Sequence, residues 1–318
     1  MHSLRIINIM KKQFICNVCK KKVHFNLFNN DELGIINKRK YYYIDCIKCG
    51  LMQIHPLPNA KELEKYYKYN SKQYSDYKIS LINRFLKSSK IGKKIIYSYF
   101  TWSYKTRAKL IKQYKSSGSI LDVGCAQGNF LNNFSCKYWD KTGIELNPML
   151  VKIAKKNFLD QKIINKFFES YNTKKKYDVV TLWQTFEHMQ SPNKILIKLS
   201  KIIKHHGFLI IEVPNSKSLN KSLFKNYWQL FQKGEHLFFW SAKSLTMILK
   251  LHKFKIRKIY YPIFDTSTSG SLVNFLSNKK IPQLIVLLLG LMSIPLGIVI
   301  NLFVYDKRDN MQIIAQKL

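Results

Sequence analysis

The sequence predicts a doubly wound α/β fold, in which helices cover both faces of a mostly parallel sheet. Two observations predict it. From residue 119 onward, short apolar runs alternate with helical patterns, as crossover connections between parallel strands require. The first of these runs also passes into a glycine-punctuated turn, between Ile120 and Leu131, before a helical pattern begins. A ligand should therefore lie at the carboxyl ends of the first strands, where such sheets bind nucleotide-like molecules.

The elements follow from runs of apolar residues bounded by turn signals. Strands are expected near 119–123, 141–145, 163–165, 177–182, 207–213, 255–262 and 311–317. Helices are expected near 128–135, 148–157, 192–204 and 241–251. Upstream, aromatic-rich amphipathic patterns predict helices over 60–69, 79–86 and 91–114. We therefore divide the chain into a small module at 1–58, a helical linker or lid at 59–117 and the main domain at 118–318.

Composition excludes a disordered chain but does not identify a partner. Of the 318 residues, 46% are hydrophobic, enough for a large domain and a small one. The formal charge is +36, from 54 Lys and Arg against 18 Asp and Glu, and the basic residues are spread along the whole chain. This charge could solvate the surface, or it could attract phosphate-rich substrates or anionic lipids. The opening residues lack a continuous apolar stretch, so we expect no secretory signal and a reducing, cytoplasmic location.

Four of the six cysteines form two C-x2-C pairs, Cys16/Cys19 and Cys46/Cys49. Two such pairs match a zinc-ribbon-like module in which four thiolates hold one tetrahedral Zn²⁺. A redox pair or free surface thiols are the alternatives. Because four protein ligands leave no open position, the zinc would be structural.

The glycine-punctuated turn carries the candidate ligand-binding residues. Asp122 ends the first strand, and Glu145 ends the second, 17 residues after Gly128. A carboxylate is an acceptor that can take both hydroxyl protons of a ribose diol.

At this point the chain resembles a class I S-adenosylmethionine-dependent methyltransferase of the branch with an N-terminal zinc module, similar to methyltransferase domain family 23. The resemblance rests on the segments 122–128, 177–183, 186–188, 211–215, 235–241 and 46–51. It implies a seven-stranded Rossmann-like methyltransferase sheet with S-adenosylmethionine as cofactor. The cofactor-binding residues would be Asp122, Gly124, Cys125, Gly128, Glu145 and Trp183.

Two positions depart from the family pattern. Ala126 stands where the common loop has glycine, which its methyl group tolerates if its φ stays negative. Gln184 stands where many relatives have histidine or an acid, so a base or ligand transferred to that position is in doubt.

The chemistry that the resemblance implies is in-line transfer of a methyl group from a sulfonium to a nucleophile. The protein would mostly align the reactants and exclude water. A hydroxyl or carbon nucleophile would also need a base, and His188, His236 and the neighbouring Glu187 are the candidates. Capping or packing under a lid is the structural alternative for both histidines. Glu187 and His188 could instead hold a divalent metal, as in relatives that methylate catechol-like quinone precursors.

Residues 284–305 carry no charge over 22 positions, with lysines before and basic residues after. We expect a hydrophobic helical insertion before the last strand. One crossing would leave the last strand on the wrong side of a membrane, so Gly290, Pro295 and Gly297 should bend the segment into a hairpin lying on the membrane surface. A spanning helix and a protein-buried or dimer-forming element are the alternatives. The expected location is the cytoplasm, peripheral or monotopic at the cytoplasmic membrane.

Four functions remain open. The leading one is methyl transfer to a sugar, nucleotide-sugar or lipid-linked glycan in cell-envelope polysaccharide biosynthesis. The alternatives are a quinone-precursor O-methyltransferase, an RNA methyltransferase that uses the zinc ribbon, and a non-catalytic scaffold. A nucleic-acid partner is disfavoured because the loop after the fourth strand lacks the Asn or Asp followed by Pro-Pro that grips an exocyclic amine. A non-catalytic scaffold is disfavoured because the candidate cofactor residues Asp122, Gly124, Gly128 and Glu145 are all present. The sequence does not name the acceptor atom or the oligomeric state.

Overall fold

The computed structural model describes residues 13–24, 35–36, 39–59, 62, 89–232, 234–263, 267–279 and 281–318. Within them, seven strands form one sheet in the order β13-β14-β11-β10-β7-β8-β9. The strands are β7 (Gly118–Val123), β8 (Trp139–Glu145), β9 (Gln161–Asn165), β10 (Tyr177–Trp183), β11 (Ile203–Pro214), β13 (Phe254–Tyr260) and β14 (Asn310–Lys317). All neighbouring pairs are parallel except those of β14, which runs antiparallel to β11 and β13. The predicted doubly wound α/β sheet is confirmed.

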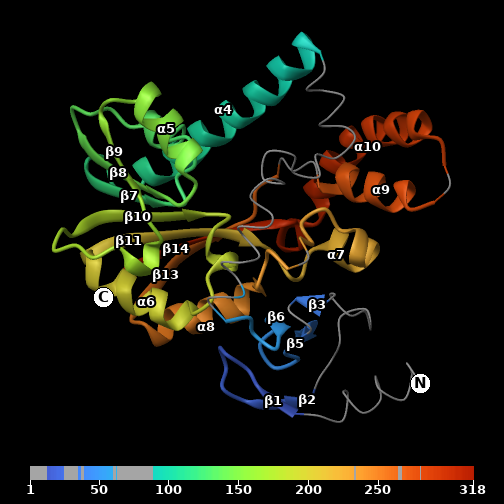
Figure 1. The fold of residues 1–318 in the computed structure, drawn as a ribbon, viewed down its shortest axis with the longest axis horizontal. Coiled ribbons are helices and arrows are strands. Elements are labelled where there is room, and N and C mark those ends of the chain that lie inside the picture. The colour runs from blue at the N-terminus through green and yellow to red at the C-terminus, as the bar shows by residue number, and fades with distance from the viewer. Residues whose placement is uncertain are drawn as a thin grey trace.

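Helices cover both faces of this sheet (Figure 1). On one face lie α4 (Lys90–Lys112) and α5 (Pro148–Asn157), and on the other lie α6 (Pro192–Ile202) and α8 (Ala242–Leu251). Alternation along each strand divides the apolar side chains between the two faces. Thus Ile120 packs in the cluster with α4 and α5, whereas Leu121 packs in the cluster with α6 and α8. Burial on both faces explains the near-continuous apolar runs of these strands.

One predicted helix, 128–135, is wrong. The chain there forms turns and a short 3₁₀ turn at Leu131–Asn133. The Asn133 side-chain amide donates to the carbonyl oxygens of Asn129 and Phe130 at 2.9 and 3.1 Å. These contacts compete with the backbone hydrogen bonds of a regular helix.

The N-terminal module consists of short antiparallel strands. They are β1 (Gln13–Ile15), β2 (Lys22–His24), β3 (Ile35–Ile36), β4 (Arg39–Lys40), β5 (Tyr42–Asp45) and β6 (Met52–His55). The outer edge of β6 pairs with β12 (Phe238–Phe239) of the main domain. The apolar residues of the module belong to the same core as those under α6 and α8. The module is thus joined to the main domain through β12, in a three-stranded sheet separate from the seven-stranded one.

The segment between β13 and β14 forms α9 (Ser267–Ser277) and α10 (Gln283–Phe303), which project from one end of the sheet beside α7 (Leu219–Phe224) (Figure 1). The helical insertion is confirmed, but the bend predicted within 284–305 is wrong, because α10 is a single helix with Pro295 inside it. Gly290 and Gly297 are buried rather than placed in a turn. A Cβ on Gly297 would lie 2.9 Å from the Thr268 Cβ, so this glycine permits close packing against α9. The predicted helices 60–69 and 79–86 lie outside the described residues, except for residue 62.

Candidate active site

The carboxyl ends of β7 and β8 bring two acidic residues to one edge of the sheet. Asp122 and Glu145 lie at the tips of these adjacent parallel strands. The Asp122 side chain is buried, and its Oδ1 accepts a hydrogen bond of 2.7 Å from Thr181 Oγ1. Burial, with a smaller contribution from the nearby Glu145 charge, raises the pKa of Asp122 to about 7, although the hydrogen bond from Thr181 and the positive charge of Arg107 both lower it. The two carboxylates thus lie at adjacent strand tips, close enough for the charge of one to affect the other.

The turn between these strands is held by Glu145. Its two carboxylate oxygens accept hydrogen bonds from the backbone amides of Ala126 (3.0 Å) and Asn147 (2.8 Å). Gly124 and Gly128 adopt φ of +79° and +76°, which suits glycine. Ala126 adopts φ of +47°, so the expectation of a negative φ at this position is wrong. Alanine therefore replaces the family's common glycine in a left-handed backbone conformation, which costs an L-residue about 1–2 kcal/mol.

The remaining cofactor candidates lie around this turn. Cys125 is buried beneath it, and burial raises the pKa of its thiol, so the side chain is a neutral packing group. Trp183 ends β10, with its ring edge-on to Phe130 and 4.8 Å from the Arg107 guanidinium carbon. Acceptor-only carboxylates beside an open turn fit a nucleoside with a ribose diol and a positive charge. These side chains are therefore suited to hold S-adenosylmethionine.

A cavity of about 430 Å³ opens beyond β10 and extends from Trp183 to the start of α9. Aromatic side chains of α4 form one wall, and amide side chains form much of the rest. The amide residues are Gln184, Gln229, Gln232, Asn310 and Gln312. His188 and His236 also line the cavity. Of the cofactor candidates, Trp183 lines this cavity.

An ion-pair network that sequence reasoning missed forms part of the cavity wall. The Arg107 guanidinium of α4 makes two hydrogen bonds to the carboxylate of Glu212 on β11. Gln184 Nε2 donates to Glu212 Oε1 at 3.2 Å and to Asn310 Oδ1 at 2.8 Å. Gln312 Nε2 donates to Glu212 Oε2 at 2.5 Å. The network ties α4 to the sheet, and Gln184, the departure from the family pattern, serves as a neutral link in it.

The three catalytic candidates lie together at the other wall. One ligand atom from each of Glu187, His188 and His236 lies within 4.8 Å of the others. The two imidazole rings meet edge-to-face with centroids 4.6 Å apart. The Glu187 carboxylate is buried, and neither of its oxygens has a hydrogen-bond partner within the described part of the chain. A group of this kind can hold a proton or a cation.

Backbone carbonyls fix how the histidines present their nitrogens. His188 Nδ1 lies 2.9 Å from the Glu235 carbonyl oxygen, which can only accept, so Nδ1 carries the proton and Nε2 the lone pair. Burial lowers the pKa of His188 to about 4. Burial and the neighbouring His188 lower the pKa of His236 well below its ordinary value, and burial raises that of Glu187. Near neutral pH both imidazoles are therefore uncharged bases.

The N-terminal module reaches this wall through Tyr43 of β5. The Tyr43 hydroxyl donates to the His236 carbonyl oxygen at 2.7 Å and accepts from the Gly234 amide at 3.1 Å. These contacts cross more than 190 residues of sequence, and no local pattern around Tyr43 indicates them. They hold the chain segment from which His236 and Glu235 extend.

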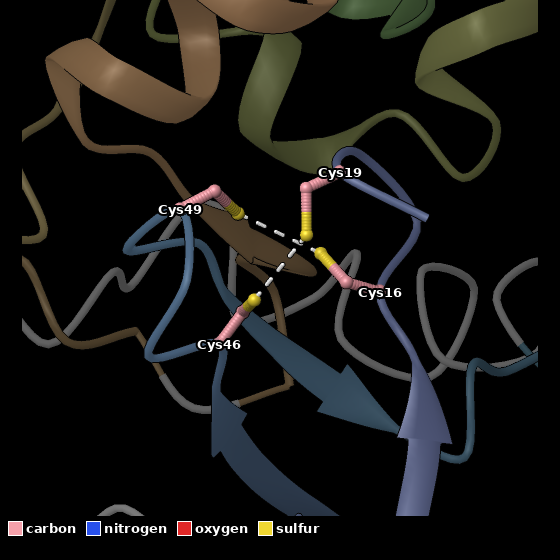
Figure 2. Close-up of side chains that lie close together, drawn as sticks. All are labelled: Cys16, Cys19, Cys46 and Cys49. Carbon is pink, nitrogen blue, oxygen red and sulfur yellow. Dashed lines mark hydrogen bonds between the residues drawn. The ribbon is translucent and has the colours of Figure 1, made fainter. Parts of the chain in front are cut away.

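The four paired cysteines converge, as the spacing predicts (Figure 2). Cys16 and Cys19 come from the turn after β1, and Cys46 and Cys49 from the turn between β5 and β6. The Sγ atoms of Cys16 and Cys49 lie 3.6 Å apart, as do those of Cys19 and Cys46, and all four lie within 4.8 Å of one another. Tetrahedral zinc with bonds of about 2.3 Å places sulfurs about 3.8 Å apart, so the four side chains fit one Zn²⁺.

Comparison with known proteins agrees with this geometry. The family described as "Methyltransferase domain" matches residues 93–259. The chain is 28% identical over 142 residues to ubiquinone biosynthesis O-methyltransferase of Hydrogenovibrio crunogenus, covering 41% of this chain and 59% of that protein. It is 25% identical over 157 residues to the mitochondrial enzyme of that name from Schizosaccharomyces pombe, covering 45% and 57%. The chain thus spans less than two thirds of the length of these relatives.

Solved structures also align with the chain. Coclaurine N-methyltransferase bound to N-methylheliamine and SAH aligns with a TM-score of 0.47 and 15% identity, over 68% of this chain and 71% of that one. The plantazolicin methyltransferase in complex with a substrate analogue and SAH aligns with a TM-score of 0.47 and 18% identity, over 81% and 96%. Together, the family match, the confirmed sheet and the paired acidic strand tips lead to one conclusion: the chain belongs to the methyltransferase-domain family.

Proposed function

We propose that this methyltransferase transfers its methyl group to a hydroxyl of a sugar-like head group, as carried by a lipid-linked glycan of the cell envelope. Asp122 and Glu145 hold the cofactor, with Gly124, Cys125, Gly128 and Trp183 shaping its surroundings. The bound cofactor supplies a methyl group on a positively charged sulfur, which needs alignment with the acceptor and exclusion of water. The chain's own residues supply both.

One observation carries the choice of acceptor: the cavity beside Trp183 combines amide side chains, aromatic walls and an uncharged imidazole. Each amide both donates and accepts hydrogen bonds, so a row of them suits a molecule with several hydroxyls. The Tyr99, Phe100 and Trp102 rings supply apolar surface on the α4 side. The cavity volume of about 430 Å³ falls in the range for small-molecule ligands and accommodates one or two sugar rings.

We assign His188 as the base that accepts the hydroxyl proton. Its Nδ1 proton is engaged by the Glu235 carbonyl oxygen, which leaves Nε2 as the acceptor, and the side chain lines the cavity while only partly buried. His236 packs against the His188 ring and limits its rotation. Glu187 lies within 4.8 Å of both, and because burial raises its pKa, its carboxyl group can hold a proton beside the two imidazoles.

A second candidate is O-methylation of a catechol-like quinone precursor. One observation that favours it is the similarity to relatives named ubiquinone biosynthesis O-methyltransferase. The other is the group of Glu187, His188 and His236, whose ligand atoms suit a divalent cation. Such a cation would bind two neighbouring phenolic oxygens of the acceptor. Gln184, bound to Glu212 and Asn310, adds no acidic ligand to this group.

The test is to incubate the purified chain with S-adenosylmethionine labelled in its methyl group, in separate reactions with cell-envelope lipid extract, a polyprenylated catechol and total RNA. We expect label in the glycolipid fraction that is stable to mild base. Label in the catechol alone, or catechol activity that requires added metal, would establish the second candidate. Label in RNA alone would overturn both. His188→Asn should abolish transfer, and His205→Asn, which changes an exposed histidine, should not.

A further inference from the structure

Helix α10 exposes its large apolar side chains and buries small or polar residues, the reverse of a helix in a soluble protein. The residues that it buries are mostly small or polar: Val286, Gly290, Ser293, Gly297 and Asn301. Its large apolar side chains face outward, and Met292 and Phe303 are 73% and 83% exposed. The other exposed ones are Leu284, Ile285, Leu288, Leu289, Leu296, Val299 and Leu302. Soluble helices place these residue types the other way round.

The buried side of α10 packs against α9 and against the chain that precedes α9. Gly297 lies against Thr268, and Ser293 Oγ donates to the Gly290 carbonyl oxygen at 2.7 Å. Asn301 Nδ2 donates to the Ile263 carbonyl oxygen at 3.1 Å. Small residues at the helix contact and polar groups bonded inside it are the arrangement found between helices in lipid. The outward face of α10 is therefore the one suited to an apolar solvent.

The charges beside α10 suit an anionic membrane. Lys279 precedes the helix and Lys307 follows it, and both are exposed. Tyr305 and Phe303 lie at its carboxyl end, where aromatic residues favour the membrane–water interface. The chain as a whole carries +36, which draws it toward anionic head groups.

The topology places α10 on the membrane rather than across it. Tyr260 at the end of β13 pairs with Gln312 of β14, so the chain leaves and re-enters the sheet at the same end. If α10 crossed the bilayer, α9 would have to provide the return. With 11 residues α9 is about 16 Å long, against about 30 Å of hydrocarbon, and it buries three serines.

The start of α9 and the chain just before it also border the acceptor cavity. Pro262, Ile263 and Ser267 line that cavity, as do Tyr99 and Trp102 of α4. A bilayer against α10 would therefore lie next to the cavity mouth, within reach of a head group held by a membrane lipid.

We infer that the outward face of α10 is a membrane-docking surface that rests in the interface of a bilayer rich in anionic lipid and delivers lipid-linked acceptors to the cavity. The docking stands on α10 itself, and only the delivery rests on the proposed function. It places the chain on the surface of a bilayer rather than across it.

The test is co-flotation of the full chain with vesicles of phosphatidylcholine alone or of phosphatidylcholine mixed with the anionic lipid phosphatidylglycerol. Wild type should float with the anionic vesicles, and less in high salt. The double change Leu288→Glu/Met292→Glu should weaken flotation at least tenfold. The matched change Leu159→Glu/Leu251→Glu alters apolar residues exposed elsewhere and should leave it unchanged.

Wild type that fails to float, or a Leu288→Glu/Met292→Glu variant that floats like wild type, would overturn the inference. So would a wild-type dimer in solution that this variant converts to monomers, since a second copy would then cover the face. Circular dichroism and binding of S-adenosylmethionine report whether the variant is folded. Flotation without transfer to glycolipid would refute the proposed acceptor and leave the docking surface standing.

Discussion

The Tyr43 hydroxyl and the His236 carbonyl oxygen are 2.7 Å apart, which joins the cysteine module to the wall of the acceptor cavity. The cysteine module therefore also has a positioning role, because it holds the segment that carries Glu235 and His236 in place. Because Glu235 in turn fixes the His188 tautomer, the module influences the candidate base without touching it.

Tyr43→Phe should lower kcat/KM for the acceptor while leaving the Kd for S-adenosylmethionine unchanged. The change removes two hydrogen bonds to the 234–236 segment and none to the cofactor residues. The loss should be about five- to 30-fold, corresponding to one or two hydrogen bonds of about 1 kcal/mol each. Tyr138→Phe, at an exposed tyrosine, is the control. Equal losses in cofactor and acceptor binding would mean that Tyr43 serves stability alone.

The cysteine module should contain one zinc per chain by elemental analysis. Cys46→Ser should lose that zinc and lower the Tm, since a site absent from the unfolded chain contributes its binding free energy to folding. Cys136→Ser, at an exposed free thiol outside the cluster, should retain both. Protein without zinc and with an unchanged Tm would favour the redox or free-thiol alternative.

The turnover number at saturating cofactor should stay nearly constant down to about pH 5. Burial lowers the pKa of His188 from 6.5 to about 4, so the imidazole remains the neutral base form across that range. An ordinary histidine would already be mostly protonated at pH 5.5. A kcat profile that falls through pH 6.5 would place the base elsewhere or in a more solvated setting.

Ala126→Gly should stabilise the protein by up to about 1 kcal/mol. The left-handed φ of +47° costs alanine about 1–2 kcal/mol, a strain that glycine avoids. Part of this gain in stability is offset because glycine loses more conformational entropy on folding. Urea unfolding measures the difference. Ala154→Gly, inside α5 and fully buried, should have the opposite sign. Destabilisation by Ala126→Gly would show that the methyl group makes a packing contact that outweighs the strain.

Local sequence patterns predicted the helices and strands that are marked by their own residues or by those at their ends. The bounds predicted for α5 match because Asn147 caps the helix and Pro148 occupies its first turn. The strands matched because apolar runs between turn signals have few other uses in an α/β chain. The 128–135 helix failed because the Asn133 side chain competes for backbone carbonyls, which a periodicity count does not register.

The cavity could not be predicted to the same extent. Its candidate histidines followed from the family resemblance, but Arg107 and Glu212 are 105 residues apart and Tyr43 and His236 are 193 apart. Nothing in the residues around Arg107 or Tyr43 identifies its partner, because the partner is supplied by the packing of distant elements. The same holds for Gly290 and Gly297, which resemble turn residues in sequence and act as contact points in the folded helix pair.

The most direct test of the account is calorimetric titration of the purified chain with S-adenosylmethionine at pH 8 and pH 6. Burial raises the pKa of Asp122 to about 7, so the carboxylate is mostly ionised at pH 8 and mostly protonated at pH 6. Since the ionised form attracts the cationic cofactor, the Kd should rise by up to about tenfold on going to pH 6. Asp122→Asn should bind more weakly at pH 8 and lose the dependence on pH. Absence of binding heat with wild type, or an Asp122→Asn variant that binds like wild type at both pH values, would contradict the central claim that Asp122 and Glu145 hold the methyl donor.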